Sequence, residues 1–270
     1  MDLSAYLARI GFDGDPAPRP ETLAEVQRRH LMAIPYENLD VMLGRTTTTD
    51  PAEAFDKMVA RRRGGWCYEM NGVMGWALAE MGFTVTRLAS GVFRSQSGDD
   101  AIGNHLVLRV DFEEGPILAD AGLAGGAITP YPVREGQFQA RGLEYRLEAV
   151  ADDWWRFHNS PQGMAPNFDF KLDRTDEAAL SRTCVKLQTE PDSMFVQNLV
   201  CHRFTPDGEV QLRGRVLRRI TRRGTEEQLL ESADHLTGVL GDEFGIDEPA
   251  AAGLWPKVCA RHDVLFPVNG

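Results

Sequence analysis

The stretch Arg61-Arg62-Arg63-Gly64-Gly65-Trp66-Cys67-Tyr68-Glu69 marks the point where this sequence begins its most regular helical pattern. From Met70 to Met81, apolar residues recur at helical spacing, and Gly82 can end the helix. The two glycines before Cys67 let the backbone approach a neighbouring group closely. The stretch therefore predicts a turn that places a cysteine at the first position of a buried helix.

The position of Cys67 favours a reactive thiolate. Helix-terminal amides stabilise negative charge, and the preceding arginines add positive charge. The other three cysteines lack such surroundings and are more typical of small buried apolar residues: Cys184, Cys201 and Cys259. Cys67 is thus the predicted nucleophile.

Residues before this stretch predict helices. Leu3, Leu7 and Ile10 recur at helical spacing, and a looser apolar stripe runs over 23–34 until Pro35. A third helix is predicted from Asp50, because an acidic cap followed by proline is a well-formed helix start. With the helix after Cys67, these segments predict a small helical bundle.

Residues after the bundle predict antiparallel strands from about Thr84 to Leu187, because short runs of Val, Leu, Phe and Tyr alternate with Gly, Pro and Asp. The clearest strands are expected at 83–88, 105–112, 117–119 and 143–150. Beyond Pro191, two strands at 195–204 and 209–220 are expected to form a hairpin around the Thr205–Gly208 turn. A last helix is predicted at 226–240.

A cysteine nucleophile needs a base, and the base needs an orienting carboxylate. His105 begins a predicted strand, and Asp120 ends the next one. The turn at 113–116 is expected to set Asp120 opposite about Arg109, four residues from His105. Spacing alone therefore does not pair the two side chains.

Composition narrows the functional classes. The 270 residues are 43% apolar, which is enough for a large core, and the net charge of −11 opposes a nucleic-acid partner. No signal peptide or membrane-spanning stretch is recognisable, so we expect a soluble cytoplasmic protein whose four cysteines are reduced. No metal is expected, because Cys201 with His202, and Cys259 with His262, offer two ligands each where zinc normally takes more.

Several stretches resemble the signatures of the arylamine N-acetyltransferase family, in matching order and over most of the chain. The cysteine motif and its upstream Pro-Tyr-Glu-Asn-Leu partner carry most of the specificity. The segment after Asp120 departs from the family pattern, which usually has an aromatic residue at the position of Leu123 and a glycine at that of Ala124. The matching stretches are Ile34–Asp40, Arg63–Glu69 with Asn71 and Gly72, the His105 strand, Asp120–Gly122 and Ser193–Leu199.

The resemblance implies an α+β fold with a helical domain at 1–88, a central antiparallel β-barrel at 89–190 and an α/β lid at 191–270. It gives Cys67, His105 and Asp120 the roles of a catalytic triad, and it makes Glu37 and Arg63 a buried structural pair. Acetyl-CoA is the implied acetyl donor and an aromatic amine or hydrazine the acceptor, by a ping-pong reaction. Expected substrate contacts are Tyr36, Tyr68, Phe93 and Leu123, and expected coenzyme contacts are Gly125, Gly126 and Thr129.

Three other functions remain open at this point. An amide synthase of the same fold would close a macrolactam from a carrier-bound acyl chain and would need a wider channel. A cysteine hydrolase or transglutaminase-like enzyme would act on peptide amides without coenzyme A. An inert ligand-binding homologue is less favoured, because it has no need of all three triad residues.

Overall fold

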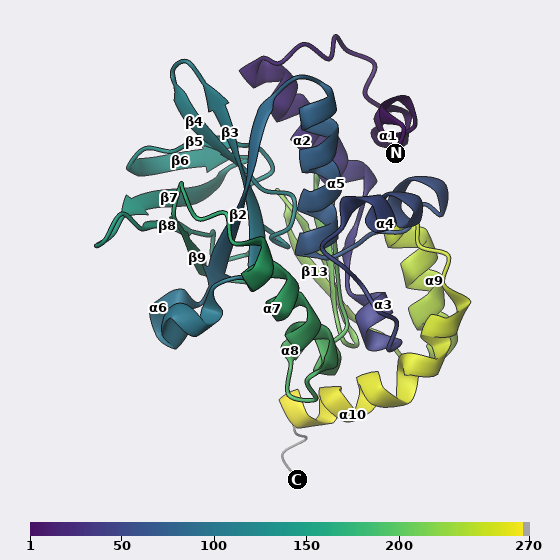
Figure 1. Cartoon of the computed structure of the whole chain (residues 1–270). Helices are drawn as coiled ribbons and strands as arrows, with labels where there is room; N and C mark the ends of the chain where they lie inside the picture. The colour runs from purple at the N-terminus through teal and green to yellow at the C-terminus, as the bar shows by residue number, and fades with distance from the viewer. Residues whose placement is uncertain (267–270) are drawn as a thin grey trace.

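A computed structural model gives the structure of the protein, and it describes residues 1–266. The fold is α+β: helices pack around two separate antiparallel sheets, one of eight strands and one of five. Figure 1 shows the eight-stranded sheet on one side of helix α5 (Cys67–Glu80) and the C-terminal helices on the other. No helix among residues 1–266 is long and apolar enough to cross a membrane.

The N-terminal third is helical, as predicted. Asp2 caps the first helix, and Asp50 accepts a hydrogen bond from the Ala52 N–H at the start of the fourth. That fourth helix continues into a π-helical turn directly before the stretch that leads to Cys67. The elements are α1 (Leu3–Ile10), α2 (Pro20–Ala33), β1 (Tyr36–Glu37), α3 (Leu39–Met42), α4 (Pro51–Phe55) and the π-helix η1 (Asp56–Ala60).

The eight-stranded sheet curls into an open barrel, with β5 and β6 as its edge strands. Its strand order is β5-β4-β3-β2-β9-β8-β7-β6. A run of stacked aromatic rings joins its strands to the buried core, including Tyr131, Phe138, Tyr145 and Phe157. The strands are β2 (Thr84–Val92), β3 (His105–Phe112), β4 (Gly115–Ala119), β5 (Tyr131–Pro132), β6 (Gly136–Ala140), β7 (Leu143–Ala149), β8 (Trp155–His158) and β9 (Asn167–Phe170).

The β3–β4 hairpin differs from its predicted register. Phe112 pairs with Gly115, so Glu113 and Glu114 alone form the turn, and Leu108 pairs with Ala119. This tighter turn shifts the register by two residues relative to the expectation. Asp120, the next residue after β4, therefore lies closer to His105 than the sequence indicated.

The expected strand region at 84–187 also contains helices. Two short ones, α6 (Arg94–Ser97) and the 3₁₀ helix η2 (Gly98–Ala101), follow β2. The longer α7 (Glu177–Thr189) begins where Asp176 caps the Ala179 N–H, and it buries Leu180 and Cys184. The prediction of strands up to Leu187 was wrong here, because a capped helix with an apolar stripe replaces them.

The five-stranded sheet has the order β1-β10-β11-β12-β13, so a strand from the N-terminal region joins the C-terminal strands. The predicted strand at 195–204 was wrong over its first half. Ser193 caps a short helix, α8 (Met194–Gln197), and the strand β10 (Val200–Phe204) begins only after it. The remaining strands are β11 (Gly208–Arg213), β12 (Val216–Thr221) and β13 (Gly224–Leu229).

The predicted helix at 226–240 was wrong over residues 226–232, because the helix begins only at Ala233. Residues 224–229 pair with β12 instead, where Glu226 and Glu227 lie opposite Arg219 and Arg218. Ser232 then caps α9 (Ala233–Phe244). Two helices that the sequence analysis did not predict close the described chain: η3 (Pro249–Leu254) and α10 (Trp255–Leu265).

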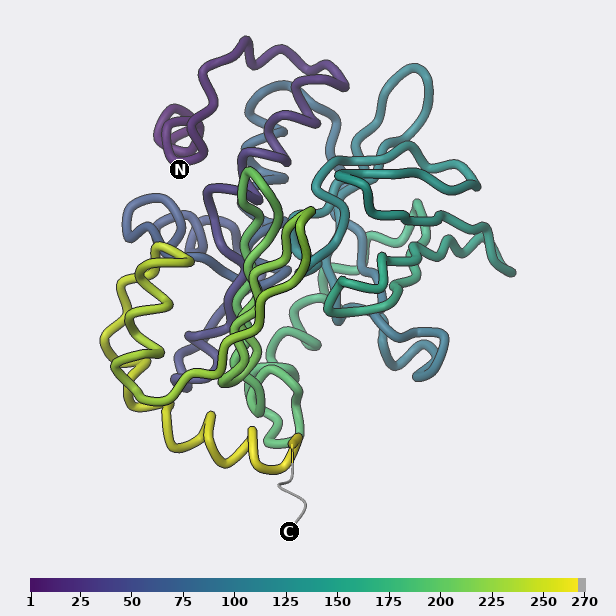
Figure 2. The backbone as a smooth tube through the Cα atoms, turned by 180° about the vertical axis from the view of Figure 1, so that it is seen from behind, coloured from purple at the N-terminus to yellow at the C-terminus, as the bar shows by residue number. Residues whose placement is uncertain are grey.

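The buried apolar residues form two clusters. The larger one joins the N-terminal helices to the curled sheet, and the smaller one lies between the five-stranded sheet and the C-terminal helices. Seen from behind, in Figure 2, the five-stranded sheet stands between these helices and the curled sheet. The division into domains at 1–88, 89–190 and 191–270 stays a prediction.

Candidate active site

Cys67 is the first residue of α5, and close packing of glycines fixes the turn before it. Gly65 N–H donates to the Pro35 carbonyl, and Glu37 N–H donates to the Gly65 carbonyl, so the turn lies against β1. A Cβ on Gly64 would meet the Pro35 carbonyl oxygen at 2.0 Å, which no side chain can do. Glycine is thus required for β1 and the cysteine turn to meet.

The Cys67 thiol is buried, with 3% of the residue's surface exposed. Burial raises the pKa of this thiol, and the backbone groups of Leu106 and Tyr68 oppose that shift without reversing it. The thiol lies 3.9 Å from the Asn104 carbonyl oxygen, to which it can donate. Burial therefore opposes the thiolate that the helix start and the preceding arginines are expected to favour, and Cys67 depends on a base to become a nucleophile.

His105 and Asp120 form a buried pair. His105 Nε2 lies 2.8 Å from Asp120 Oδ2, and both residues are almost fully enclosed. Because a carboxylate accepts hydrogen bonds, this contact places the ring proton on Nε2 and leaves Nδ1 as the basic nitrogen. The structure thus brings together two residues that strand spacing alone did not pair.

Neutral amides hold the Asp120 carboxylate in place. Its Oδ1 accepts from Asn71 Nδ2 at 2.8 Å and from the Gly122 N–H at 2.7 Å. The Gln27 side chain accepts from the Asp120 N–H, and Asn71 also donates to the Leu106 carbonyl, next to His105. Asn71 lies four residues after Cys67 on the same helix face, so one helix positions both the cysteine and the carboxylate.

Gly122 brings the Asp120 loop against the cysteine. A Cβ at Gly122 would meet Cys67 Cα at 2.7 Å and Asn71 Nδ2 at 2.6 Å. Any larger residue here would push Asp120 and Cys67 apart.

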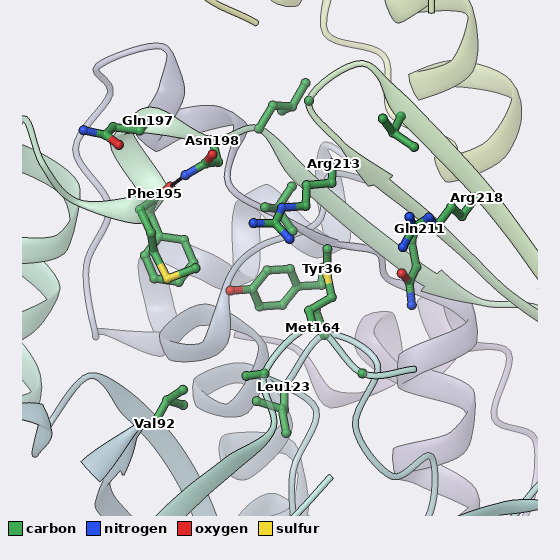
Figure 3. A pocket seen from close by; sticks show the side chains of 18 of the residues that line it. Tyr36, Val92, Leu123, Met164, Phe195, Gln197, Asn198, Gln211, Arg213 and Arg218 are labelled. Atoms are coloured by element: carbon green, nitrogen blue, oxygen red, sulfur yellow. Dashed lines mark hydrogen bonds between the residues drawn. The ribbon is translucent and has the colours of Figure 1, made fainter. Parts of the chain in front are cut away.

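A cavity of about 600 Å³ opens over Cys67 and His105, which both line it. The loops 122–124 and 161–165 border it on the side of the curled sheet. Strands β11 and β12 and helices α8 and α10 border the other side, and Figure 3 shows the side chains converging on the space. The candidate nucleophile and base therefore face a volume in the size range of small-molecule sites.

Comparisons with known proteins agree with this architecture. A profile of the N-acetyltransferase family matches residues 20–251. An arylamine N-acetyltransferase of Mycolicibacterium smegmatis is 36% identical over 94% of each chain, and one of Mycobacterium tuberculosis is 33% identical over 92% of this chain and 90% of its own. The solved arylamine N-acetyltransferase of Mycobacterium marinum in complex with CoA superposes with a TM-score of 0.85 at 33% identity, covering 97% of this chain and 99% of that one.

The chain belongs to the arylamine N-acetyltransferase family. Family membership makes it an acyltransferase, and the matched range includes Cys67, His105 and Asp120.

Only some of the predicted substrate and coenzyme residues of this N-acetyltransferase line the cavity. Tyr36, Phe93 and Leu123 line the cavity. Tyr68 does not; its hydroxyl donates to the Gly103 carbonyl at 2.6 Å and so ties α5 to the segment before His105. Within the described residues, the lining also omits three glycine-loop positions, namely Gly125, Gly126 and Thr129.

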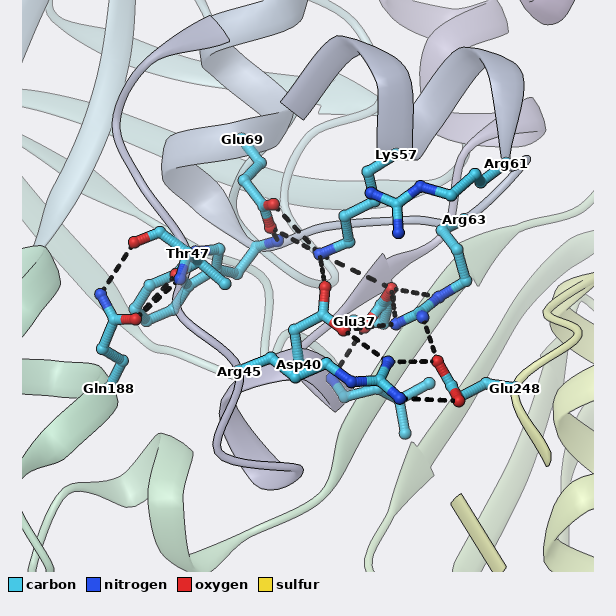
Figure 4. A network of polar contacts seen from close by, with 12 residues as sticks. Glu37, Asp40, Arg45, Thr47, Lys57, Arg61, Arg63, Glu69, Gln188 and Glu248 are labelled. Atoms are coloured by element: carbon cyan, nitrogen blue, oxygen red, sulfur yellow. Dashed lines mark hydrogen bonds and ion pairs between the residues drawn. The ribbon is translucent and has the colours of Figure 1, made fainter. Parts of the chain in front are cut away.

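A network of buried charges surrounds the start of α5 in this N-acetyltransferase (Figure 4). Arg63 donates to Glu37 at 2.8 Å, which is the contact that the family resemblance implied. Lys57 Nζ lies 3.0 Å from both carboxylate oxygens of Glu69 and 2.8 Å from Asp40. Glu69 in turn accepts from the Trp66 N–H, directly before Cys67. The network therefore holds the backbone that delivers the nucleophile.

The network also reaches the C-terminal region. Arg63 Nη1 lies 2.6 Å from Glu248, which precedes η3, and Arg45 contacts both Glu248 and Asp40. Burial alone would lower the pKa of Lys57, but Glu37, Glu69 and Asp40 outweigh it and raise that pKa above its ordinary value. Lys57 is therefore charged at neutral pH.

Sequence reasoning gave no role to several positioning residues. Gln27 and Asn71 are polar residues on otherwise apolar helix faces, between Leu23 and Leu31 on α2 and between Met70 and Met74 on α5. A buried polar side chain needs hydrogen-bond partners, so a polar residue on an apolar helix face indicates a positioning role. Lys57 gave the same signal beside the apolar Met58. Among residues 1–266, no group of three or more His, Cys, Asp or Glu side chains could hold a metal ion.

Proposed function

We propose that this protein transfers an acetyl group from acetyl-CoA to an aromatic amine or arylhydrazine, through a thioester on Cys67. The observation that carries the proposal is that Cys67 and His105 line the same cavity, with His105 hydrogen-bonded to Asp120. The names of the relatives, and the CoA complex of the Mycobacterium marinum protein, support the choice of donor and acceptor.

In the first half-reaction, His105 acts as a general base. Cys67 Sγ attacks the acetyl carbonyl carbon while its proton moves to His105 Nδ1. The carbon–sulfur bond to coenzyme A then breaks, and the same proton passes to the departing thiolate. Asp120 fixes the ring and stabilises the imidazolium that forms in between.

In the second half-reaction, the amine nitrogen attacks the acetyl group on Cys67 and loses a proton to His105. Cys67 leaves as a thiolate and is protonated again. Anilines and arylhydrazines suit this step because they are largely unprotonated at neutral pH. The Cys67 N–H, at the start of α5, is the candidate donor to the oxyanion in both halves.

The proposed acceptor contacts rest on position in the cavity, and the proposed coenzyme contacts rest on amides and a hydroxyl that a glycine-rich loop can offer to a phosphate. Tyr36, Phe93 and Leu123 are proposed acceptor contacts because they line the space over Cys67. The proposed coenzyme contacts at Gly125, Gly126 and Thr129 lie in the loop that follows Asp120. Three cavity arginines offer further positive charge for phosphates: Arg213, Arg218 and Arg261.

The rival functions have less support. A same-fold amide synthase would share the site, but the named relatives are arylamine N-acetyltransferases. A cysteine hydrolase needs no coenzyme, and an inert binder needs no His105–Asp120 pair. We place the protein in the cytoplasm, where thiols stay reduced; its cysteines Cys67, Cys184, Cys201 and Cys259 are free.

Initial-rate kinetics with acetyl-CoA and an arylhydrazine test the proposal. Parallel lines in double-reciprocal plots, together with a burst of one coenzyme thiol per protein in the absence of hydrazine, are expected from a ping-pong enzyme. Cys184→Ala is the matched control, because it removes another buried cysteine and should keep the burst. Release of acetate without the hydrazide product would favour the hydrolase, and absence of any burst would favour the amide synthase or the inert binder.

A further inference from the structure

The face of the five-stranded sheet that borders the cavity carries a row of polar and aromatic side chains. Directly paired residues point to the same face, and the pairing runs from Tyr36 to His202, Gln211, Arg218 and Glu227. All of these except His202 line the cavity, and His202 is buried within the row. Neither His202 nor Gln211 has a part in the mechanism above.

A buried hydrogen-bonded pair, His202 and Glu209, supports the middle of this row. Glu209 lies two residues before Gln211, so both side chains project from the same face of β11. Glu209 Oε2 lies 2.8 Å from His202 Nε2, and its Oε1 lies 3.0 Å from Gln211 Nε2. Because a carboxylate only accepts, His202 and Gln211 both donate to it.

These contacts fix the orientation of the Gln211 amide. Its Nε2 also donates to the Gln162 carbonyl at 3.2 Å, so both amide hydrogens have acceptors in the protein. Oε1 then points away from Glu209, and no residue between 1 and 266 donates to it. Gln211 is 94% buried, since 6% of its surface is exposed, and it lines the cavity beside Arg213 and Arg218 (Figure 3).

We propose that Gln211 Oε1 accepts a hydrogen bond from an N–H group of a bound substrate, and that Glu209 and His202 are positioning residues that keep this oxygen facing the cavity. The proposal rests on the acetyl-transfer function above. Two substrates supply such a group: the amide N–H groups in the pantetheine arm of acetyl-CoA, and the N–H groups of the acceptor. A side-chain carbonyl held this way favours a substrate group that donates a hydrogen bond and disfavours a group that can only accept one.

Separate measurement of the two half-reactions tests the proposal with Gln211→Met, which keeps the side-chain length and removes the acceptor. Acetylation of the enzyme is measured with acetyl-CoA and with p-nitrophenyl acetate, which has no N–H, and deacetylation is measured with an arylhydrazine. We expect a loss of about 3- to 10-fold, the usual range for one hydrogen bond, in the second-order rate constant for the substrate that supplies the N–H. Acetylation by p-nitrophenyl acetate should be unchanged.

The pattern of loss distinguishes the two sources. A loss confined to acetyl-CoA assigns the bond to the coenzyme arm, and a loss confined to the hydrazine step assigns it to the acceptor. Rates within twofold of wild type in both steps, or an equal loss with p-nitrophenyl acetate, would overturn the proposal. Failure of the wild-type enzyme to be acetylated by any donor would instead count against the proposed function.

Two further variants separate positioning from general damage. Glu209→Gln keeps the shape but can donate to the Gln211 carbonyl, which lets the amide rotate; we expect a smaller loss in the same step, seen in KM rather than kcat. Unchanged constants in this variant would overturn the orienting role of Glu209. Gln228→Met is the matched control, because Gln228 pairs with Leu217 on the opposite face of the sheet and is exposed.

Discussion

Two networks of polar groups flank the active site, and they differ in charge. The network at the start of α5 joins the buried cations Lys57 and Arg63, and the exposed Arg45, to four carboxylates, Glu37, Asp40, Glu69 and Glu248. The network around His105 and Asp120 instead uses the side-chain amides of Asn71 and Gln27 and the backbone N–H of Gly122.

The difference follows from what each network has to position. The charged network at the start of α5 must join segments that lie far apart in the sequence, from Glu37 to Glu248. Charged groups with several partners can do so. The histidine side must hold one carboxylate beside one ring. Charged neighbours there would change the balance of charge on His105, whereas neutral amides fix Asp120 without adding charge.

The largest effect, on the rate of acetylation, is expected from Asp120→Asn in the neutral network. The new side-chain oxygen would keep the hydrogen bonds from Asn71 and Gly122, so its NH₂ group would face His105 Nε2. His105 would then carry its proton on Nδ1 and could not accept one from Cys67. We expect acetylation of Cys67 to slow on the order of 10⁴-fold, as when the carboxylate of a catalytic triad becomes an amide.

Stopped-flow release of the coenzyme thiol measures this rate. Asp111→Asn, on the same β3–β4 hairpin and half-exposed, is the matched control and should stay near the wild-type rate. A rate for Asp120→Asn within tenfold of wild type would show that Asp120 does not set the state of His105.

A change in the charged network at the start of α5 should lower the stability of the fold. Lys57→Met removes a buried cation and leaves Glu69 and Asp40 without their closest partner. We expect the free energy of unfolding to fall by about 3–5 kcal/mol, the usual cost of removing one member of a buried ion pair. Urea denaturation followed by circular dichroism measures it.

The matched control is Arg61→Met, four residues further along the chain. Arg61 pairs with Asp56, but both side chains are more than half exposed, so the change should cost at most about 1 kcal/mol. Equal losses for Lys57→Met and Arg61→Met would mean that burial adds nothing to the charged network.

The sequence predicted each half of the site to a different extent. Glycines and helical spacing correctly indicated that Cys67 begins a buried helix, because these are local signals. The pairing of His105 with Asp120 depends on the length of one turn, and Glu113 and Glu114 permit more than one register. The family resemblance supplied the assignment where spacing left it open.

Long-range contacts were the part that sequence could not give. The link between Arg63 and Glu248 spans 185 positions and depends on how the C-terminal segment folds back. The errors at 195–204 and 226–240 have a related cause. Apolar residues there fit both a helix and a strand, and a Ser193 cap or a pairing of β13 with β12 decides between them.

A smaller effect, on stability in acid, is expected from His30, which lies near the neutral network. His30, one turn after Gln27 on α2, is fully buried; burial, with a lesser contribution from Arg9, lowers its pKa from 6.5 to about 3. The unfolded chain therefore binds a proton below about pH 6.5 that the folded chain refuses, so stability falls as the pH drops towards 3. Between pH 7 and pH 5 the expected loss is about 2 kcal/mol.

His30→Gln should lose less stability over the same pH range, because glutamine does not titrate. Urea denaturation of both proteins at pH 7 and pH 5 gives the difference between the two slopes. Identical pH dependence in the two proteins would show that the side chain at position 30 is not kept neutral by burial.

Intact-protein mass spectrometry tests the central claim, that Cys67 carries the acetyl group, most directly. The protein is mixed with acetyl-CoA without an amine, digested to map the modification, and then treated with an arylhydrazine. We predict a single acetyl adduct on Cys67 that the hydrazine removes, and no adduct in a folded Cys67→Ala variant. An adduct on another residue, or transfer to the hydrazine by Cys67→Ala, would contradict the claim.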